Sequence, residues 1–303
     1  MEKAEFFSHV MDGGDVRCDV IVATGSNEIS DVCEAGYFDR KDRAKVVLQL
    51  HLAPRGFFKW RHPLRNWRIR KAFNRADAVQ VLCRSYESEF RRIAPAPRVY
   101  VIGNYTDMPE EVPCRDAGQG RSGRPVILYP AAVLNKVKNQ RLLIEAFALL
   151  ASDFPEWKVR LLGRDETPYA KMCRRLIAAK RLDGRIEVAG FTDRLKEEYA
   201  SAAFIAFPST LEGFPLAILE AARFSLAAVA QSGLPGIGDI VTEDSGIVTD
   251  PNAAAYAAGL RRLMEDDSLR RKLGDGARVH CGNRYGRDKI LDQWEMLLEN
   301  VVK

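Results

Sequence analysis

The sequence predicts an α/β protein of two domains, each built around a parallel sheet. Short apolar runs alternate with helix-period segments through the second half of the chain, and the first half shows a shorter version of the same pattern. A polar segment at residues 106–124, rich in Gly, Pro and charge, lies between the halves. We therefore expect an N-terminal domain over residues 1–118 and a C-terminal domain over residues 119–303.

Strand-like runs in the first half are rich in β-branched residues. They lie at residues 18–25, 45–51, 77–83 and 98–104, and a helix is expected over 85–93. In the second half the runs are continuously apolar, as in strands buried on both faces. They lie at 125–130, 158–163, 185–190, 203–208, 226–230 and 246–250. The strict alternation with helices predicts right-handed crossovers and a doubly wound sheet.

Helices in the second half are expected between the strand-like runs, at residues 139–150, 168–180, 194–201 and 215–224. Helical patterns dominate after residue 252. The last helix, residues 287–301, carries an apolar stripe that includes Trp294. Such a stripe needs a surface to bury against, so we expect this helix to pack on the N-terminal domain.

The composition of the 303-residue chain, 47% apolar and 29% charged, is typical of a globular protein. No apolar run reaches the roughly 18–20 residues that a membrane span needs. The first ten residues show no export signal, and the six cysteines are scattered singly. We expect a cytosolic protein with reduced thiols, without a disulfide framework or a zinc site.

Residues 54–75 form a strongly basic segment. Eight Lys and Arg side chains and no acidic one occur there, and the aromatic residues Phe57, Phe58, Trp60 and Trp67 are interleaved among them. Such a composition favours an anionic partner, either a membrane surface or a charged acceptor. The alternatives are a helix with a solvated basic face and, less favoured, contact with nucleic acid. We expect no nucleic acid and a peripheral position at the inner face of a membrane.

Two acidic residues flank the start of the helix expected over 215–224. Glu220 is the acidic residue inside that otherwise apolar helix, and Glu212 lies eight residues earlier, in the turn after a strand. A buried carboxylate needs hydrogen-bond donors, which a ribose diol would supply. The free amides at the helix start would bind an anion or a hydroxyl at the carboxyl end of the sheet. The alternative is a structural ion pair between Glu220 and Arg223.

The segment from Glu212 to Leu216, followed by Leu219-Glu220-Ala221, resembles the two-glutamate motif of the family-4 retaining glycosyltransferases, the glycosyl transferases group 1. The resemblance extends from residues 75–107 to residues 269–280, with the intervening segments in family order. It implies the GT-B fold, in which two Rossmann-like domains face each other across a cleft. It also implies that a nucleotide sugar, with a UDP or GDP carrier, is the donor.

The same resemblance assigns roles by position. Glu220 would hold the donor ribose, Glu212 would contact the transferring sugar, and Lys138 would neutralise the donor pyrophosphate. His51 would lie at the interface of acceptor and donor and complete a catalytic set with Glu212 and Lys138. The backbone of the segment Gly213, Phe214, Pro215 and Leu216, with its free amides, would line the transferring sugar and the phosphates. Gly190 and Phe191 would lie beside the base, and Asn104 would lie at the cleft edge.

Two departures from the family pattern bear on the activity. Ala132 stands where the family has an arginine, and Lys136 or Arg164 are the candidates to replace its charge. Nothing before Cys18 resembles the strand and glycine-rich loop with which family members open, so we expect a shortened N-terminal domain. A truncated product, a compact variant and a subunit completed by a partner chain are the alternatives.

The function that the resemblance implies is transfer of a sugar with retention of configuration to a glycan, lipid-linked or other acceptor, in bacterial-type glycan or glycolipid synthesis. No bound metal or other cofactor is expected, because cations and helix N-termini stabilise the leaving phosphate in this fold. The motifs of P-loop ATPases, classical dehydrogenases, zinc peptidases and serine hydrolases are absent from the sequence. A non-catalytic sugar-nucleotide-binding or scaffolding subunit is the alternative.

Overall fold

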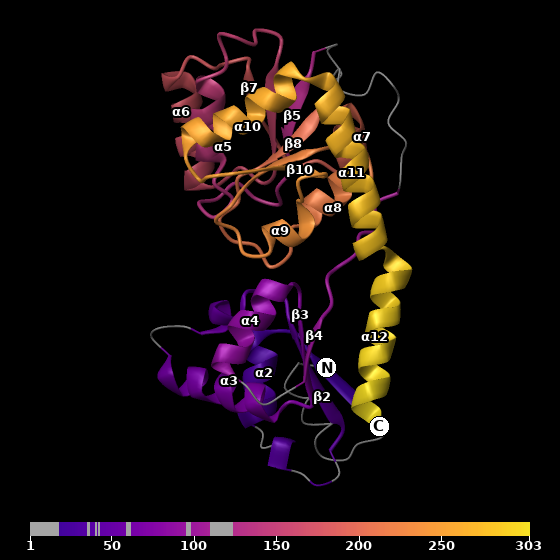
Figure 1. Cartoon of the computed structure of the whole chain (residues 1–303). Coiled ribbons are helices and arrows are strands. Elements are labelled where there is room, and N and C mark those ends of the chain that lie inside the picture. Colours follow the sequence, from indigo (N-terminus) through magenta and orange to yellow (C-terminus); the bar gives the residue numbers. More distant parts are fainter. Residues whose placement is uncertain are drawn as a thin grey trace. The chain divides into compact units, whose positions relative to one another are not determined.

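The computed structural model describes residues 18–34, 37–39, 41, 43–58, 62–94, 98–109 and 124–303. These residues fall into two compact units (Figure 1). The first unit comprises the chain up to Asn104 together with Asp288–Lys303, and the second comprises Tyr105–Arg287. The boundary expected between residues 118 and 119 lies outside the described residues.

The first unit contains a parallel four-stranded sheet in sequential order. Its strands are β1 (Val20–Ala23), β2 (Lys45–Leu50), β3 (Ala78–Val81) and β4 (Arg98–Val101). The connections carry α2 (Ser26–Glu34), α3 (Pro63–Arg75) and α4 (Arg84–Ile93), with short 3₁₀ turns at Tyr37–Asp39 and Pro54–Phe57. The strands expected from the sequence are all present, whereas α2 was not expected.

The C-terminal helix α12 (Arg287–Val302) belongs to this first unit from Asp288 onward. Three members of its apolar stripe are buried, Ile290, Leu297 and Val301. Near its end, Nη1 of Arg98 in β4 donates to the carbonyl of Asn300 at 2.9 Å. The helix thus buries part of its stripe against the unit formed by the N-terminal half of the chain, while Leu291 stays 44% exposed.

The second unit contains a parallel six-stranded sheet in the order β10-β9-β8-β5-β6-β7. The strands are β5 (Val126–Tyr129), β6 (Lys158–Leu162), β7 (Ile186–Gly190), β8 (Phe204–Phe207), β9 (Ala228–Gln231) and β10 (Gly246–Thr249). The chain therefore moves outward from β5 to β7, returns to the middle at β8 and continues in the opposite direction. The order reverses between β5 and β8, which is where Rossmann-type sheets bind ligands.

Helices cover both faces of this sheet (Figure 1). Helices α5 (Gln140–Ala148) and α6 (Pro168–Ala179) pack together, and α7 (Leu195–Ser201) and α8 (Leu216–Ala222) follow β7 and β8. The chain continues through α9 (Ile237–Ile240), α10 (Ala253–Glu265) and α11 (Asp267–Tyr285). The expected doubly wound α/β arrangement is thereby present. In the described residues no helix is both long and apolar enough to cross a membrane.

Candidate active site

A cavity of about 380 Å³ opens at the carboxyl ends of the central strands of the second unit. The loops after β5, β6, β7 and β8 all contribute to its wall, so it lies at the point where the strand order reverses. Its lining residues are Pro130, Ala131, Ala132, Lys138, Leu162, Gly163, Phe191, Thr192, Leu195, Phe207, Glu212, Phe214, Pro215, Leu216, Ala217 and Glu220.

The loops after β5 and β6 approach each other closely under this cavity. Gly163, which follows β6, has φ +125°, a conformation that favours glycine. A side chain at this position would also come within 2.6 Å of the carbonyl oxygen of Ala131. The Gly163 amide donates to the carbonyl of Gly190, the last residue of β7. Glycine at this position therefore allows three strand ends to meet and leaves space above them.

Lys138 and Glu212 form an ion pair inside the cavity. Nζ of Lys138 lies 2.6 Å from Oε1 of Glu212, and the two side chains are only 21% and 12% exposed. The two residues are 74 positions apart in the chain, but they follow the neighbouring strands β5 and β8. The structure thus brings together two of the three predicted catalytic residues.

Backbone contacts hold the loops that carry this pair. The amide of Thr210 donates to the carbonyl of Val137 at 2.8 Å, so the loop after β8 is fastened to the loop after β5. The buried Tyr129 hydroxyl donates to the carbonyl of Lys138 at 2.7 Å. Burial raises the pKa of Tyr129 well above its ordinary value, so the phenol stays protonated and donates. The Lys138 ammonium is consequently presented from a fixed backbone.

Glu220 lies in the same cavity, on α8. The buried Tyr199 hydroxyl donates to Oε2 of Glu220 at 2.8 Å, and no described residue donates to Oε1. Burial and the nearby carboxylate raise the pKa of Tyr199 well above its ordinary value, so this donor is also permanent. One carboxylate oxygen is therefore fixed by the protein, and the other is available to a ligand in the cavity.

The alternative interpretation of Glu220 was an ion pair with Arg223. In the structure Nε of Arg223 donates to the carbonyl of Met108 at 3.2 Å, whereas the protein partner of the Glu220 carboxylate is Tyr199. The Glu220 carboxylate thus has a neutral partner. No ion pair joins it to Arg223, the residue that follows α8.

The remaining predicted residues of the second unit fall into three groups. Phe191, 70% exposed, and Phe214, Pro215 and Leu216 line the cavity. Gly190 ends β7 with φ +75°, and Gly213 precedes Phe214. Neither glycine is part of the cavity lining. Lys136 and Arg164 are exposed and lie outside the lining, so no lysine or arginine besides Lys138 lines it among the described residues.

His51 and Asn104 belong to the first unit. His51 is exposed at the end of β2, and Asn104 follows β4 and is partly buried. The carboxyl ends of parallel strands are also where ligand-binding residues are expected in this sheet. The roles of His51 and Asn104 at the acceptor side stay predictions.

The expected row of free amides from Gly213 to Leu216 is shorter than predicted. The Leu216 amide donates to the carbonyl of Phe214 at 2.9 Å, and the Ile218 amide donates to that of Pro215 at 2.9 Å. The helix α8 starts at Leu216 rather than at Pro215, because proline serves as its N-cap residue. The amide of Leu216 is therefore already engaged in this conformation.

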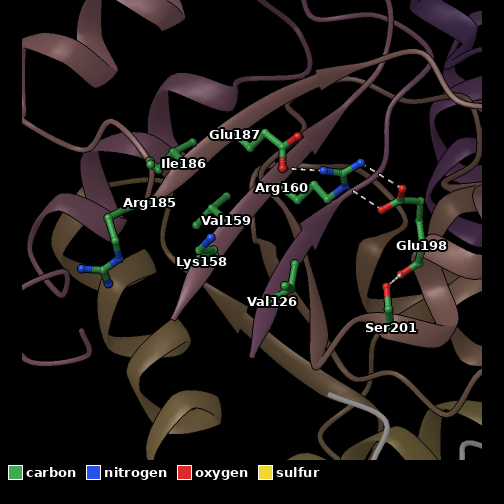
Figure 2. A pocket seen from close by; sticks show the side chains of 10 residues that line it. Val126, Lys158, Val159, Arg160, Arg185, Ile186, Glu187, Glu198 and Ser201 are labelled. Carbon is green, nitrogen blue, oxygen red and sulfur yellow. Dashed lines mark hydrogen bonds and ion pairs between the residues drawn. The ribbon is translucent and has the colours of Figure 1, made fainter. Parts of the chain in front are cut away.

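A second cavity, of about 500 Å³, lies near the amino ends of β5, β6 and β7 (Figure 2). Three of its charged groups pair with each other, because Arg160 donates to both carboxylate oxygens of Glu198, at 2.7 and 3.0 Å, and also to Glu187. Arg185 on its rim donates to three backbone carbonyls. Such mutual pairing is typical of a structural network, so we do not take this cavity as the candidate site.

Two site residues were missed by the sequence analysis, Tyr129 and Tyr199. Each lies within a predicted element, but its role depends on a hydrogen bond to a residue reached only through the tertiary fold. The available signal was a hydroxyl-bearing aromatic residue in a buried strand or helix, which needs a polar partner. The described residues contain no cluster of three His, Cys, Asp or Glu side chains placed to hold a metal ion.

Known proteins resemble this chain in sequence and in fold. The family model for glycosyl transferases group 1 matches residues 115–280. An exopolysaccharide phosphotransferase of Streptomyces coelicolor is 32% identical over 211 residues, which cover 68% of this chain and 21% of that protein. An amylovoran biosynthesis glycosyltransferase of Erwinia amylovora is 23% identical over 223 residues, which cover 74% of this chain and 62% of that protein. The chain spans less than two thirds of either relative.

Among solved structures, the Anabaena protein HepE in complex with UDP-glucose aligns with a TM-score of 0.80 and 21% sequence identity. The alignment covers 93% of this chain and 79% of that chain. At this identity the likeness establishes the fold, and the predicted GT-B-like α/β fold is confirmed. Because the family model matches more than half of the residues, the chain belongs to the glycosyl transferases group 1 family.

Proposed function

We propose that this protein is a retaining glycosyltransferase that moves a sugar from a UDP- or GDP-sugar to a glycan, lipid-linked or other acceptor in bacterial-type glycan or glycolipid synthesis. One observation carries the proposal. A lysine and a glutamate are paired at 2.6 Å in a cavity at the strand-order reversal, and the same cavity contains a second glutamate with an available oxygen. These are the groups that a diphosphate, a sugar and a ribose would need.

The three groups would divide the donor between them. The Lys138 ammonium would leave Glu212 in part to meet the diphosphate, since an anion with two charges competes well for a cation in a half-buried site. Glu212 would then accept hydrogen bonds from hydroxyls of the transferring sugar. Glu220 would accept hydrogen bonds from the ribose through its available oxygen. Phe191 would offer its exposed ring to the base.

Retention requires the acceptor hydroxyl to attack the anomeric carbon from the face that the diphosphate leaves. The bond between this carbon and the diphosphate oxygen breaks, a bond to the acceptor oxygen forms, and the hydroxyl proton passes to the leaving oxygen on that face. Negative charge grows on the diphosphate during this step. A cation fixed beside it lowers the barrier because its charge is already oriented. We assign this role to Lys138, because its ammonium group lies in the cavity.

The names of the relatives support the choice of substrates. The Anabaena neighbour was crystallised with UDP-glucose, and the Streptomyces and Erwinia relatives are named for exopolysaccharide and amylovoran. A nucleoside diphosphate-sugar donor and a glycan-type acceptor are the corresponding proposals for this chain.

Slow hydrolysis of the donor tests the proposal without knowledge of the acceptor. The full chain is incubated with a panel of UDP- and GDP-sugars, and release of the free nucleoside diphosphate is followed. We expect one donor to be hydrolysed faster than the others and faster than without protein, because water can replace the acceptor. A chain that binds a sugar nucleotide but hydrolyses none would instead support the non-catalytic subunit.

We further propose that nucleotide binding requires no divalent metal, because Lys138 supplies a cation at the position of the diphosphate. Titration calorimetry with UDP and GDP, with and without EDTA, measures this directly. The expected dissociation constants with and without EDTA agree within about twofold, a difference of about 0.4 kcal/mol. Loss of binding in EDTA, restored by Mg²⁺ or Mn²⁺, would contradict the proposal.

A further inference from the structure

Helix α3 of the first unit presents an unusual outward face. Leu64 is 74% exposed and Trp67 is 59% exposed, although both are large apolar side chains. They are three residues apart and therefore neighbours on one side of the helix. The opposite side buries Ile69, Ala72 and Phe73 in the core of the unit. The exposure of Leu64 and Trp67 is thus a property of the helix surface and does not come from a helix that fails to pack.

Basic side chains continue this face by one turn. Arg70 is exposed, and Lys71 is partly exposed, with its Nζ 5.5 Å from the centroid of the Trp67 ring. The Arg70 guanidinium lies 5.4 Å from the centroid of the Phe58 ring. Cation–π contacts of this kind hold the positive charges directly beside aromatic surface. The helix α3 contains no Asp or Glu.

We propose that the face formed by Leu64, Trp67, Arg70 and Lys71 docks the protein on a membrane surface that contains anionic lipid. The apolar pair would enter the boundary between headgroups and acyl chains, where the amphipathic ring of a tryptophan is favoured. Arg70 and Lys71 would meet the lipid phosphates, and their aliphatic stems would extend along the apolar surface. The combination of apolar and basic side chains selects this partner.

Other occupants match the face less well. A solvated helix would explain Arg70 and Lys71 but not the exposure of both Leu64 and Trp67. A single-stranded nucleic acid would use Trp67 as a stacking surface and the two basic side chains, but it would leave the exposed Leu64 without a role. A protein partner would have to bury Lys71, and lysine is depleted from protein–protein interfaces. The sequence adds Lys59, Trp60 and Arg61 just before α3; these residues lie outside the described ones.

Vesicle binding by the full chain tests the proposal. Sedimentation is measured with vesicles of phosphatidylcholine alone and of phosphatidylcholine mixed with phosphatidylglycerol, and tryptophan fluorescence is recorded on the same samples. We expect binding to the anionic vesicles, weakened by salt, with a blue shift of the emission. The blue shift should be smaller in Trp67→Phe, because a tryptophan entering the headgroup region would be missing.

Two double variants separate the two components of the face. Leu64→Ser with Trp67→Ser and, separately, Arg70→Gln with Lys71→Gln should each weaken binding to anionic vesicles by about tenfold. The matched controls lie in the second unit: Leu149→Ser with Val279→Ser, which are 56% and 54% exposed, and Arg175→Gln with Lys180→Gln, which are exposed on or beside α6. Both control pairs should bind vesicles like the wild type.

Three results would overturn the proposal. The first is equal binding to neutral and anionic vesicles, or to neither. The second is unchanged affinity for anionic vesicles in the variant Leu64→Ser with Trp67→Ser, which would leave only a solvated basic face. The third is binding of a single-stranded oligonucleotide that depends on Arg70 and Lys71 while vesicle binding does not. Donor hydrolysis is a separate readout, because the cavity belongs to the second unit and these four residues to the first.

Discussion

Lys138→Ala is expected to lower the kcat of donor hydrolysis and of sugar transfer by about 10²–10³. The ammonium lies 2.6 Å from Glu212 in a cavity where both side chains are mostly shielded from water. In such a site the fixed ammonium group stabilises the growing charge of the leaving diphosphate. In the variant, water would replace the ammonium group and would first have to reorient. Because the charge develops in the transition state, kcat should fall more than KM rises.

Two further variants define what Lys138 contributes. Lys138→Arg keeps the charge with a different geometry and should retain more activity than Lys138→Ala. Lys171→Ala removes an exposed lysine from α6, outside the cavity lining, and should behave like the wild type. If Lys138→Ala lowers the melting temperature but leaves kcat unchanged, the ion pair with Glu212 is structural. An unchanged kcat with a higher KM would limit Lys138 to ground-state binding of the donor.

The sheet of the second unit could be predicted because parallel strands buried on both faces appear as short apolar runs. All six expected runs overlap observed strands, and each of the four expected helices overlaps an observed one within a few residues. The four-residue helix α9 was not predicted, since a single turn leaves no period to detect. In the first unit α2 does carry a signal, because Ile29, Val32 and Cys33 are buried with helical spacing.

The candidate site was predicted from motifs and a family resemblance, but its internal contacts were not. The pairing of Lys138 with Glu212 follows from β5 and β8 being neighbours, which depends on the strand order. Neither local spacing nor charge could distinguish Lys138 from Lys136, because the direction of a loop side chain is set by tertiary hydrogen bonds such as the one from Tyr129. For the same reason Tyr199 could not be recognised as the partner of Glu220.

Glu220→Gln is expected to weaken binding of the nucleoside diphosphate by roughly tenfold to a hundredfold. Hydrogen bonds to a charged acceptor contribute about 1.5–3 kcal/mol each, against about 1 for a neutral one, and 1.4 kcal/mol corresponds to a factor of ten. The melting temperature of the unliganded protein should change little, because the glutamine carbonyl can still accept from Tyr199. Calorimetry and thermal unfolding of the same variant measure both quantities.

Tyr199→Phe provides the companion test. It removes the hydroxyl that holds Oε2 of Glu220 and keeps the ring, which stacks on Phe224 with centroids 5.6 Å apart. The carboxylate stays charged but is no longer held by this hydrogen bond, so nucleotide affinity should fall by only about threefold to fivefold, in line with one neutral hydrogen bond of about 1 kcal/mol. The double variant should lose less binding free energy than the sum of the two single variants, since both changes act on one contact.

The two measurements distinguish a donor-binding glutamate from a structural one. A donor-binding Glu220 predicts weaker nucleotide binding and an unchanged melting temperature in Glu220→Gln, with a smaller effect in Tyr199→Phe. A structural Glu220 predicts the opposite: the melting temperature falls in both variants, because the buried Tyr199 hydroxyl loses its charged acceptor or is itself removed, and nucleotide affinity holds. The available oxygen of the carboxylate, at the carboxyl ends of β5 and β8, favours the first result.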